Sequence, residues 1–164
     1  MQASTRALHA CDAPGDRILR PVLADCVRDY GVFYQTVDPD SVGQLEAFCA
    51  SDIVFRDPFN EIRGLPGFSR VFLHMFEALD RPRFEILDTA ISGRTAYYKW
   101  RFTACTKRGR MNLDLVGMTE AVFDIDGRVS THIDYWDSAS QLYARLPLIG
   151  GAFGWFNRRF RVPA

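Results

Sequence analysis

Residues 96–136 carry the clearest structural signal in the chain, and they read AYYKWRFTACTKRGRMNLDLVGMTEAVFDIDGRVSTHIDYW. Apolar and polar side chains alternate there with a period near two, which is typical of half-buried strands. The pairs Arg108-Gly109 and Asp126-Gly127 interrupt the pattern, and Ser92-Gly93 precedes it. Such pairs mark tight turns between antiparallel strands. We therefore predict an antiparallel meander with strands at residues 84–87, 96–106, 112–123 and 129–136.

The chain before this meander has a helical pattern. Apolar residues recur every three or four positions over residues 18–37 and 68–79, which predicts two amphipathic helices. Asp38-Pro39 resembles a helix start and predicts a short helix up to Phe48, and a strand is expected at residues 52–57. After the meander, Asp137 is expected to cap a short helix over residues 139–146. Helices followed by a sheet indicate an α+β fold, with the helices on one face of a strongly curved sheet.

Length and composition limit the domain organisation and the class of partner. The 164 residues correspond to one domain, and 48% hydrophobic with 24% charged residues is ordinary for a globular protein. We expect a flexible tail at residues 1–16, a domain at 17–147 and an aromatic and basic extension at 148–164. Twenty basic residues balance twenty acidic ones, so no nucleic-acid partner is expected.

The cysteines indicate neither a metal site nor a disulfide framework. Cys11, Cys26, Cys49 and Cys105 are scattered, without a CxxC pair and without histidine at ligand spacing. Reduced thiols in a cytoplasmic protein are the expected state. No stretch approaches the roughly 20 apolar residues of a membrane span.

Three segments of the chain resemble the nuclear transport factor 2-like superfamily. They are Phe55-Arg56-Asp57-Pro58-Phe59, the run from Phe123 to Val129, and the run from His132 to Asp137. The branches of this superfamily include ketosteroid isomerases, SnoaL-type polyketide cyclases and limonene-epoxide hydrolases. The resemblance covers roughly residues 20 to 150. It implies a cone-shaped barrel of mostly antiparallel sheet wrapped around N-terminal helices, an apolar pocket, no cofactor, and a homodimer formed through the outer sheet face.

The resemblance to the isomerases implies a proton-shuttling base at Asp57. Those enzymes also use a tyrosine in the first helix and a protonated aspartic acid in the third meander strand. Phe33 falls at the tyrosine position, with Tyr30 one helical turn away, and the aspartic acid position falls at Met118 or Thr119. The isomerase set is therefore incomplete.

The resemblance to the hydrolases and cyclases implies a reactive carboxylate at Asp134. The hydrolase arginine corresponds to Arg101, or to Trp100 if the alignment shifts by one residue. Side chains alternate across a strand, so His132, Asp134 and Trp136 share one face of the last strand. The resemblance directs this face to the cavity.

Our leading hypothesis is a cofactor-independent acid–base enzyme of the isomerase, cyclase, dehydratase or epoxide hydrolase type. Asp57 and Asp134 would move protons, with Arg101 orienting a carboxylate and His132 assisting, on a small hydrophobic ligand with a polar head. The predicted pocket residues are Tyr30, Phe33, Phe55, Phe72, Met75, Met118 and Trp136.

The alternative is a non-catalytic binding or structural protein. Asp57 would then only cap the turn before Pro58, Asp134 would form an ion pair with Arg101, and His132 would be a satisfied buried histidine. For residues 148–164, closing one end of the cone or packing on a second subunit is favoured over contact with a membrane.

Overall fold

The computed structural model describes residues 14–107, 111–145 and 155. One six-stranded sheet in the order β2-β1-β6-β5-β4-β3 forms the body of the protein. The elements are α1 (Pro14–Thr36), η1 (Val42–Gln44), α2 (Leu45–Phe48), β1 (Cys49–Arg56), β2 (Glu61–Arg63), α3 (Leu65–Ala78), β3 (Leu79–Ser92), β4 (Thr95–Thr106), β5 (Asn112–Phe123), β6 (Val129–Trp136), α4 (Ser138–Gln141) and η2 (Tyr143–Arg145).

The predicted α+β class and the predicted meander are confirmed. Strands β3, β4, β5 and β6 pair antiparallel in chain order, and β5 and β6 have the predicted bounds. Strand β1 lies parallel to β6, and the short β2, which was not predicted, pairs antiparallel with β1. The sheet is strongly curved rather than closed, with β2 and β3 at its edges.

Strand β3 is much longer than its predicted core of residues 84–87. Its pairing with β4 shifts register between Asp80 and Arg83 and again between Ile86 and Asp88. Such bulges break the period-two pattern by which a strand is recognised in a sequence. An edge position also leaves most of its side chains exposed, so the contrast between its two faces is weak.

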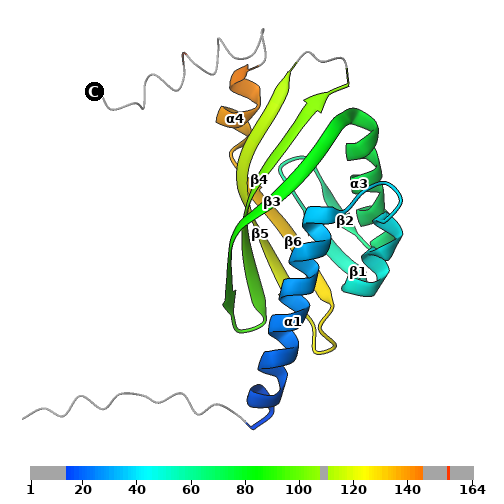
Figure 1. Cartoon of the computed structure of the whole chain (residues 1–164), viewed down its shortest axis with the longest axis vertical. Coiled ribbons are helices and arrows are strands. Elements are labelled where there is room, and N and C mark those ends of the chain that lie inside the picture. The colour runs from blue at the N-terminus through cyan, green and yellow to red at the C-terminus, as the bar shows by residue number, and fades with distance from the viewer. Residues whose placement is uncertain (1–13, 108–110, 146–154, 156–164) are drawn as a thin grey trace, which may run out of the picture.

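The helices cover the concave face of the sheet. Figure 1 shows β3 to β6 bending around α1 and α3. Helix α1 buries Val27, Tyr30, Phe33 and Tyr34, whose spacing of three and four residues places them on one face. Helix α3 begins after Gly64, whose φ of 87° is accessible to glycine, and Pro66 lies in its first turn.

The expected short helix at Asp38 starts later than predicted. The carboxylate of Asp38 accepts hydrogen bonds from the backbone N–H groups of Asp40 and Ser41, which forms a turn, and η1 begins only at Val42. The expected cap at Asp137 is confirmed, because its side chain accepts the backbone N–H of Ser140 at 3.0 Å. This bonding lowers the pKa of Asp137, with the Ser140 hydroxyl as the largest cause.

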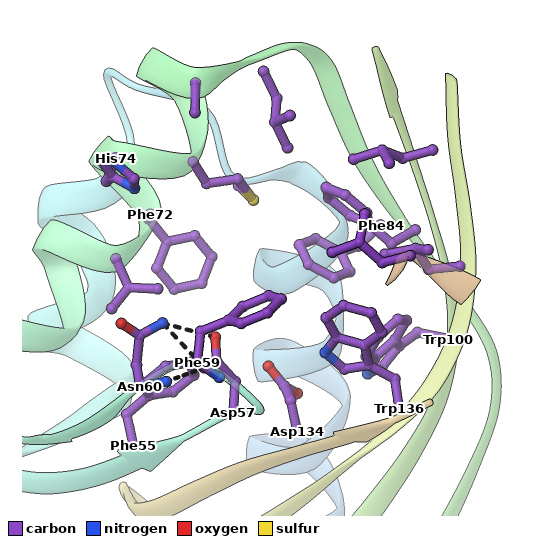
Figure 2. A pocket seen from close by; sticks show the side chains of 18 of the residues that line it. Phe55, Asp57, Phe59, Asn60, Phe72, His74, Phe84, Trp100, Asp134 and Trp136 are labelled. Atoms are coloured by element: carbon purple, nitrogen blue, oxygen red, sulfur yellow. Dashed lines mark hydrogen bonds between the residues drawn. The ribbon is translucent and has the colours of Figure 1, made fainter. Parts of the chain in front are cut away.

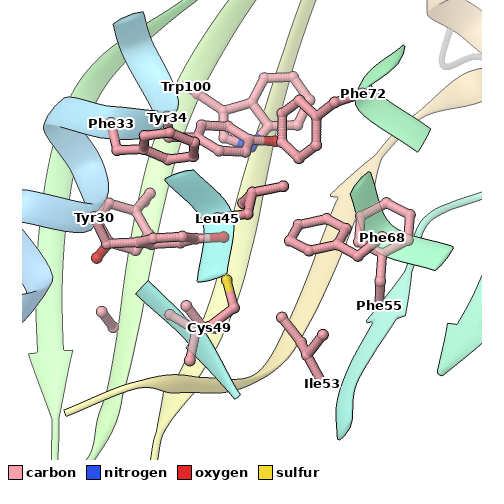
Figure 3. Packing of buried hydrophobic residues seen from close by; sticks show 14 of the residues in the cluster. Tyr30, Phe33, Tyr34, Leu45, Cys49, Ile53, Phe55, Phe68, Phe72 and Trp100 are labelled. Carbon is pink, nitrogen blue, oxygen red and sulfur yellow. The ribbon is translucent and has the colours of Figure 1, made fainter. Parts of the chain in front are cut away.

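The core lies between the helices and the sheet (Figure 3). Large side chains from both layers are almost fully buried there, among them Tyr30, Leu45, Ile53, Phe68 and Phe123. Cys49 is buried in this core, and Cys26 and Cys105 are also free thiols. Among the described helices, none is long and apolar enough to cross a membrane. Of the expected tail at residues 1–16, residues 14–16 lie in α1, and residues 1–13 lie outside the described residues, as does the expected extension apart from Trp155.

Candidate functional site

A cavity of about 390 Å³ opens between α3 and the concave face of the sheet. Its wall is mostly aromatic and aliphatic, and its two carboxylates and the Asn60 amide lie together on one side (Figure 2). Of the predicted pocket residues, the cavity is lined by Phe55, Phe72, Met75 and Trp136. A volume of this size is within the range of small-molecule sites.

Asp134 is a nearly buried acidic group at this cavity. It lies on β6, where period-two alternation turns it inward with Trp136, and its side chain is only 10% exposed. Its Oδ1 accepts a hydrogen bond from the Thr119 hydroxyl at 2.5 Å and lies 3.1 Å from His132 Nε2. Among the described residues, its Oδ2 has one hydrogen-bond contact, from the Tyr34 hydroxyl at 3.4 Å. One carboxylate oxygen is thus held by buried donors, and the other retains capacity for a ligand.

His132 connects this carboxylate to the core. The Tyr30 hydroxyl lies 2.7 Å from Nδ1 of the fully buried ring. A carboxylate oxygen only accepts hydrogen bonds, so the proton between His132 and Asp134 resides on Nε2. In the neutral ring, Nδ1 then accepts the Tyr30 hydroxyl proton. Burial raises the pKa of Tyr30 well above its ordinary value, so this hydroxyl remains a donor at neutral pH.

A second chain of hydrogen bonds reaches Asp134 from β4. The indole N–H of Trp100 donates to the Thr119 hydroxyl at 2.9 Å, which leaves the hydroxyl proton directed to Asp134. Trp100 can lie across β5 because its pairing partner there is Gly117. A Cβ at that position would lie 2.4 Å from the indole ring. This chain was not predicted from the sequence.

Asp57 follows directly after β1 and lies at the same cavity. Its Oδ1 accepts the backbone N–H of Phe59 at 2.7 Å and that of Asn60 at 2.5 Å, and the Asn60 side-chain amide is 3.0 Å from both carboxylate oxygens. The turn-capping role considered for Asp57 is therefore present in the structure. Because both aspartates line one cavity, the structure brings together the acidic pair expected from the sequence.

Tyr34 is the residue of α1 that brings a hydroxyl to the cavity, whereas Tyr30 and Phe33 do not line it. Burial, and then the charge of Asp134, raise the pKa of Tyr34 well above its ordinary value. Its hydroxyl is therefore protonated at neutral pH and can donate to a ligand. The prediction that Tyr30 and Phe33 line the pocket is wrong, because Tyr30 lies in the core on His132 and Phe33 stacks on Phe48 at 4.8 Å.

The expected role of Arg101 at the carboxylates is also wrong. Arg101 lies on the outer face of β4 and forms a two-pronged ion pair with Asp114, with both N–O distances at 2.7 Å. Trp100 occupies the inward position that the shifted alignment offered. The sequence itself indicates that Arg101 faces outward, because every second residue of β4 is apolar and Arg101 falls between them. The buried residues are Ala96, Tyr98, Trp100, Phe102 and Ala104.

The prediction that Met118 lines the pocket is also wrong, because the same alternation turns its side chain outward. It is 40% exposed on the outer face of β5, the face expected to meet a second subunit, while Thr119 points inward and is buried. Of the two positions that the resemblance to the isomerases offered for an aspartic acid, Thr119 is therefore the one that faces the interior. No group of three or more metal-ligating side chains occurs among the residues that the structure describes.

The fold and the cavity define a class, the cone-like α+β proteins that hold a pocket between a curved sheet and its helices. Solved proteins with ketosteroid isomerase-like and nuclear transport factor 2-like folds match the structure. The sequence pattern of the SnoaL-like domain matches residues 32–132, and the chain belongs to this family. The resemblance inferred from the sequence is confirmed at this level.

Three solved structures illustrate the similarity. A Jannaschia protein named for its likeness to SnoaL polyketide cyclases aligns with a TM-score of 0.64 and 12% identity, over 80% of this chain and 93% of its own. An LEH-like epoxide hydrolase from M. tuberculosis aligns with a TM-score of 0.61 and 17% identity, over 72% and 86%. A Catenulispora acidiphila protein solved with trimethylamine aligns with a TM-score of 0.61 and 14% identity, over 72% and 89%. At these identities the likeness shows the fold alone.

A curated relative of another kind matches part of the sequence. Human carbohydrate sulfotransferase 1 is 29% identical over 121 residues, which cover 74% of this chain. The match spans only 29% of that protein. It therefore does not assign the chain to that family.

Proposed function

We propose that this protein is an acid–base enzyme of the isomerase or cyclase type, in which Asp134 transfers a proton to or from an apolar ligand with a polar head. The observation that carries the proposal is the asymmetry of Asp134. Its Oδ1 is held by Thr119 and His132, whereas its Oδ2 faces an apolar cavity with a single long contact from Tyr34. A carboxylate that is fixed in orientation and open on one oxygen is suited to general base catalysis.

The remaining residues have defined parts in this proposal. His132 and Thr119 are positioning residues, because they contact the carboxylate and not the cavity. Tyr34 donates to oxygen charge that develops on the ligand, since its hydroxyl is at the cavity and its pKa is raised. Opening an epoxide with an orienting arginine is disfavoured, because Arg101 is committed to Asp114 on the outer face.

The solved relatives do not decide between the types of reaction. They include a protein likened to SnoaL polyketide cyclases, an LEH-like epoxide hydrolase and a protein solved with trimethylamine. Binding without chemistry is therefore a second candidate, and one observation favours it: the carboxylate of Asp57 is engaged by its own turn. The two candidates differ in whether Asp134 moves a proton.

A general-base probe tests this difference. The compound 5-nitrobenzisoxazole is small and apolar, and removal of its C3 proton breaks its N–O bond to give a coloured nitrophenolate. We expect the protein to accelerate this elimination and Asp134→Asn to lower the rate by roughly a hundredfold or more, the usual contribution of a positioned base. Arg101→Gln, which alters only the outer face, is the matched control and should retain the rate. Equal rates for Asp134→Asn and the unmodified protein would contradict the proposal and favour binding without chemistry.

A further inference from the structure

The cavity has an unbalanced charge pattern. Among its described lining residues, Asp57 and Asp134 are acidic, whereas none is lysine or arginine, and the only other titratable side chains are Tyr34 and the exposed His74. Over the described residues, the ion pairs involve neither acid with a lysine or arginine. Arg56 lines an adjoining hollow with both acids but forms its ion pair with Glu61, at 3.8 Å. The two carboxylates beside an apolar wall therefore give the cavity a negative potential.

Each carboxylate has one oxygen that can accept more hydrogen bonds. Within the part of the chain that the structure describes, Oδ2 of Asp134 has only the 3.4 Å contact with Tyr34, and Oδ2 of Asp57 has only the amide of Asn60 at 3.0 Å. An ionised carboxylate offers about four acceptor sites, so both groups retain capacity. Figure 2 shows the two side chains together on the floor of the cavity, beneath Phe59 and beside Trp136.

The walls above this floor are ring systems. Those that line the cavity include Phe55, Phe59, Phe72, Phe84, Trp100 and Trp136. Phe59 and Trp136 meet edge to face, with centroids 5.5 Å apart. The faces of aromatic rings attract cations, and tryptophan does so most strongly. Carboxylate acceptors on the floor and aromatic rings on the walls are both complementary to a positively charged head group.

We propose that this cavity selects an organic cation, with an ammonium group at Asp57 and Asp134 and an apolar body against the aromatic walls. This inference rests on the proposed function, since it names the substrate class of the same cavity. An ammonium group donates hydrogen bonds to the two Oδ2 atoms and gains charge attraction there. A carboxylate or phosphate ligand would meet charge of its own sign without a compensating cation.

Three probes that differ mainly in charge test the inference. They are 2-phenylethylammonium, 2-phenylethanol and phenylacetate, which share one ring and similar length and are positive, neutral and negative near pH 7. Binding to the full chain is followed by NMR at the indole N–H groups of Trp100 and Trp136. We expect the ammonium probe to bind about tenfold or more tightly than the alcohol, a difference of about 1.4 kcal/mol, and phenylacetate to bind weakest. No ammonium binding at about 10 mM, or equal affinity for all three, would overturn the inference.

Variants that remove one negative charge test whether Asp57 and Asp134 cause the preference for the ammonium probe. Asp57→Asn and Asp134→Asn should each weaken ammonium binding about tenfold and change 2-phenylethanol binding by less than about twofold. Arg101→Gln should leave both affinities unchanged. Asparagine retains the acceptor oxygen that each site uses, and the indole NMR signals report whether each variant is folded. Should one variant fail to fold, the other and the three-probe series still decide. An ammonium preference that survives both substitutions overturns the inference.

The two proposals can fail separately. An ammonium preference without proton transfer to 5-nitrobenzisoxazole would retain the ligand class and remove the enzymatic proposal. Proton transfer that depends on Asp134, without an ammonium preference, would retain the enzyme and remove the ligand class.

Discussion

The ring of His132 lies among four aromatic rings, those of Tyr30, Tyr34, Phe55 and Phe68, with centroid separations from 5.3 to 6.0 Å. Both of its nitrogens have partners, Tyr30 on the core side and Asp134 on the cavity side. The imidazole is therefore fixed by packing and by hydrogen bonds at once. This makes His132 a residue through which the core sets the orientation of the proposed base.

The Tyr30 hydroxyl should contribute measurably to stability. Tyr30→Phe leaves Nδ1 of the buried His132 ring without a partner, and an unsatisfied buried polar group costs about 1–3 kcal/mol. We expect a loss of that size in the free energy of unfolding, measured with urea. Tyr135→Phe is the control, because the Tyr135 hydroxyl is exposed and bonds Glu120 at 3.2 Å, so its loss should cost less than about 0.5 kcal/mol. Equal losses in the two variants would show that the His132 contact is not stabilising.

At the scale of elements, the pairing of β4 with β5 shapes the site. Trp100 lies opposite Gly117. Two residues further along β5, the Thr119 hydroxyl accepts a hydrogen bond from the indole and donates one to Asp134. Without a side chain at Gly117, the indole ring covers the strand and reaches the hydroxyl. The close approach of this ring to β5 thus depends on a single glycine.

Gly117→Ala should therefore destabilise the protein. The added Cβ would lie 2.4 Å from the indole ring and 2.9 Å from Trp136 Cβ, so the strands or rings must shift, which costs about 1–3 kcal/mol. Urea unfolding measures the loss, and the elimination rate should fall with it because Trp100 and Thr119 hold Asp134. Gly43→Ala is the control, since nothing lies within 4 Å of the added atom and no loss is expected. A variant at Gly117 as stable as the one at Gly43 would contradict the packing argument.

At the scale of the whole molecule, the core holds several groups in their protonated form. Burial raises the pKa of Tyr30 and Tyr34 well above their ordinary values and raises the pKa of Tyr98, whose hydroxyl donates to the Val27 carbonyl at 2.7 Å. It also raises the pKa of the Cys49 thiol from 9.0 to about 12. Each of these groups keeps its proton in the folded protein at a pH where the unfolded chain has lost it.

Alkaline pH should therefore unfold the protein. Above about pH 9 the unfolded state binds fewer protons than the folded state, so the free energy of unfolding falls as pH rises, by up to about 1.4 kcal/mol per pH unit for each such group. For Cys49 the loss occurs between pH 9.0 and about 12. Urea unfolding from pH 7 to 11 should show a plateau and then a decline. Cys49→Ala should be less stable at pH 7 but decline less steeply, and an unchanged slope would contradict the assignment.

Much of the fold follows from patterns within short stretches of the chain. The meander strands β4, β5 and β6, the helical faces of α1 and α3, and the cap at Asp137 were predictable because periodicity and capping depend on residues a few positions apart. The same alternation places Arg101 and Met118 outside, whereas Trp100 and Thr119, the neighbouring positions that the resemblance also offered, face inward. The alternation thus decides between positions that the resemblance left open, because successive side chains of a strand point to opposite faces.

The cavity and its polar partners required the folded chain. Tyr30 and His132 are separated by 102 positions and Tyr34 and Asp134 by 100, and no local pattern relates them. Strand β2 and the parallel pairing of β1 with β6 likewise join segments that carry no mutual signal. Periodicity shows which side of an element is buried, because burial follows from the chain's own geometry. Which polar groups then meet depends on strand register and helix packing, because these bring distant segments within hydrogen-bonding distance.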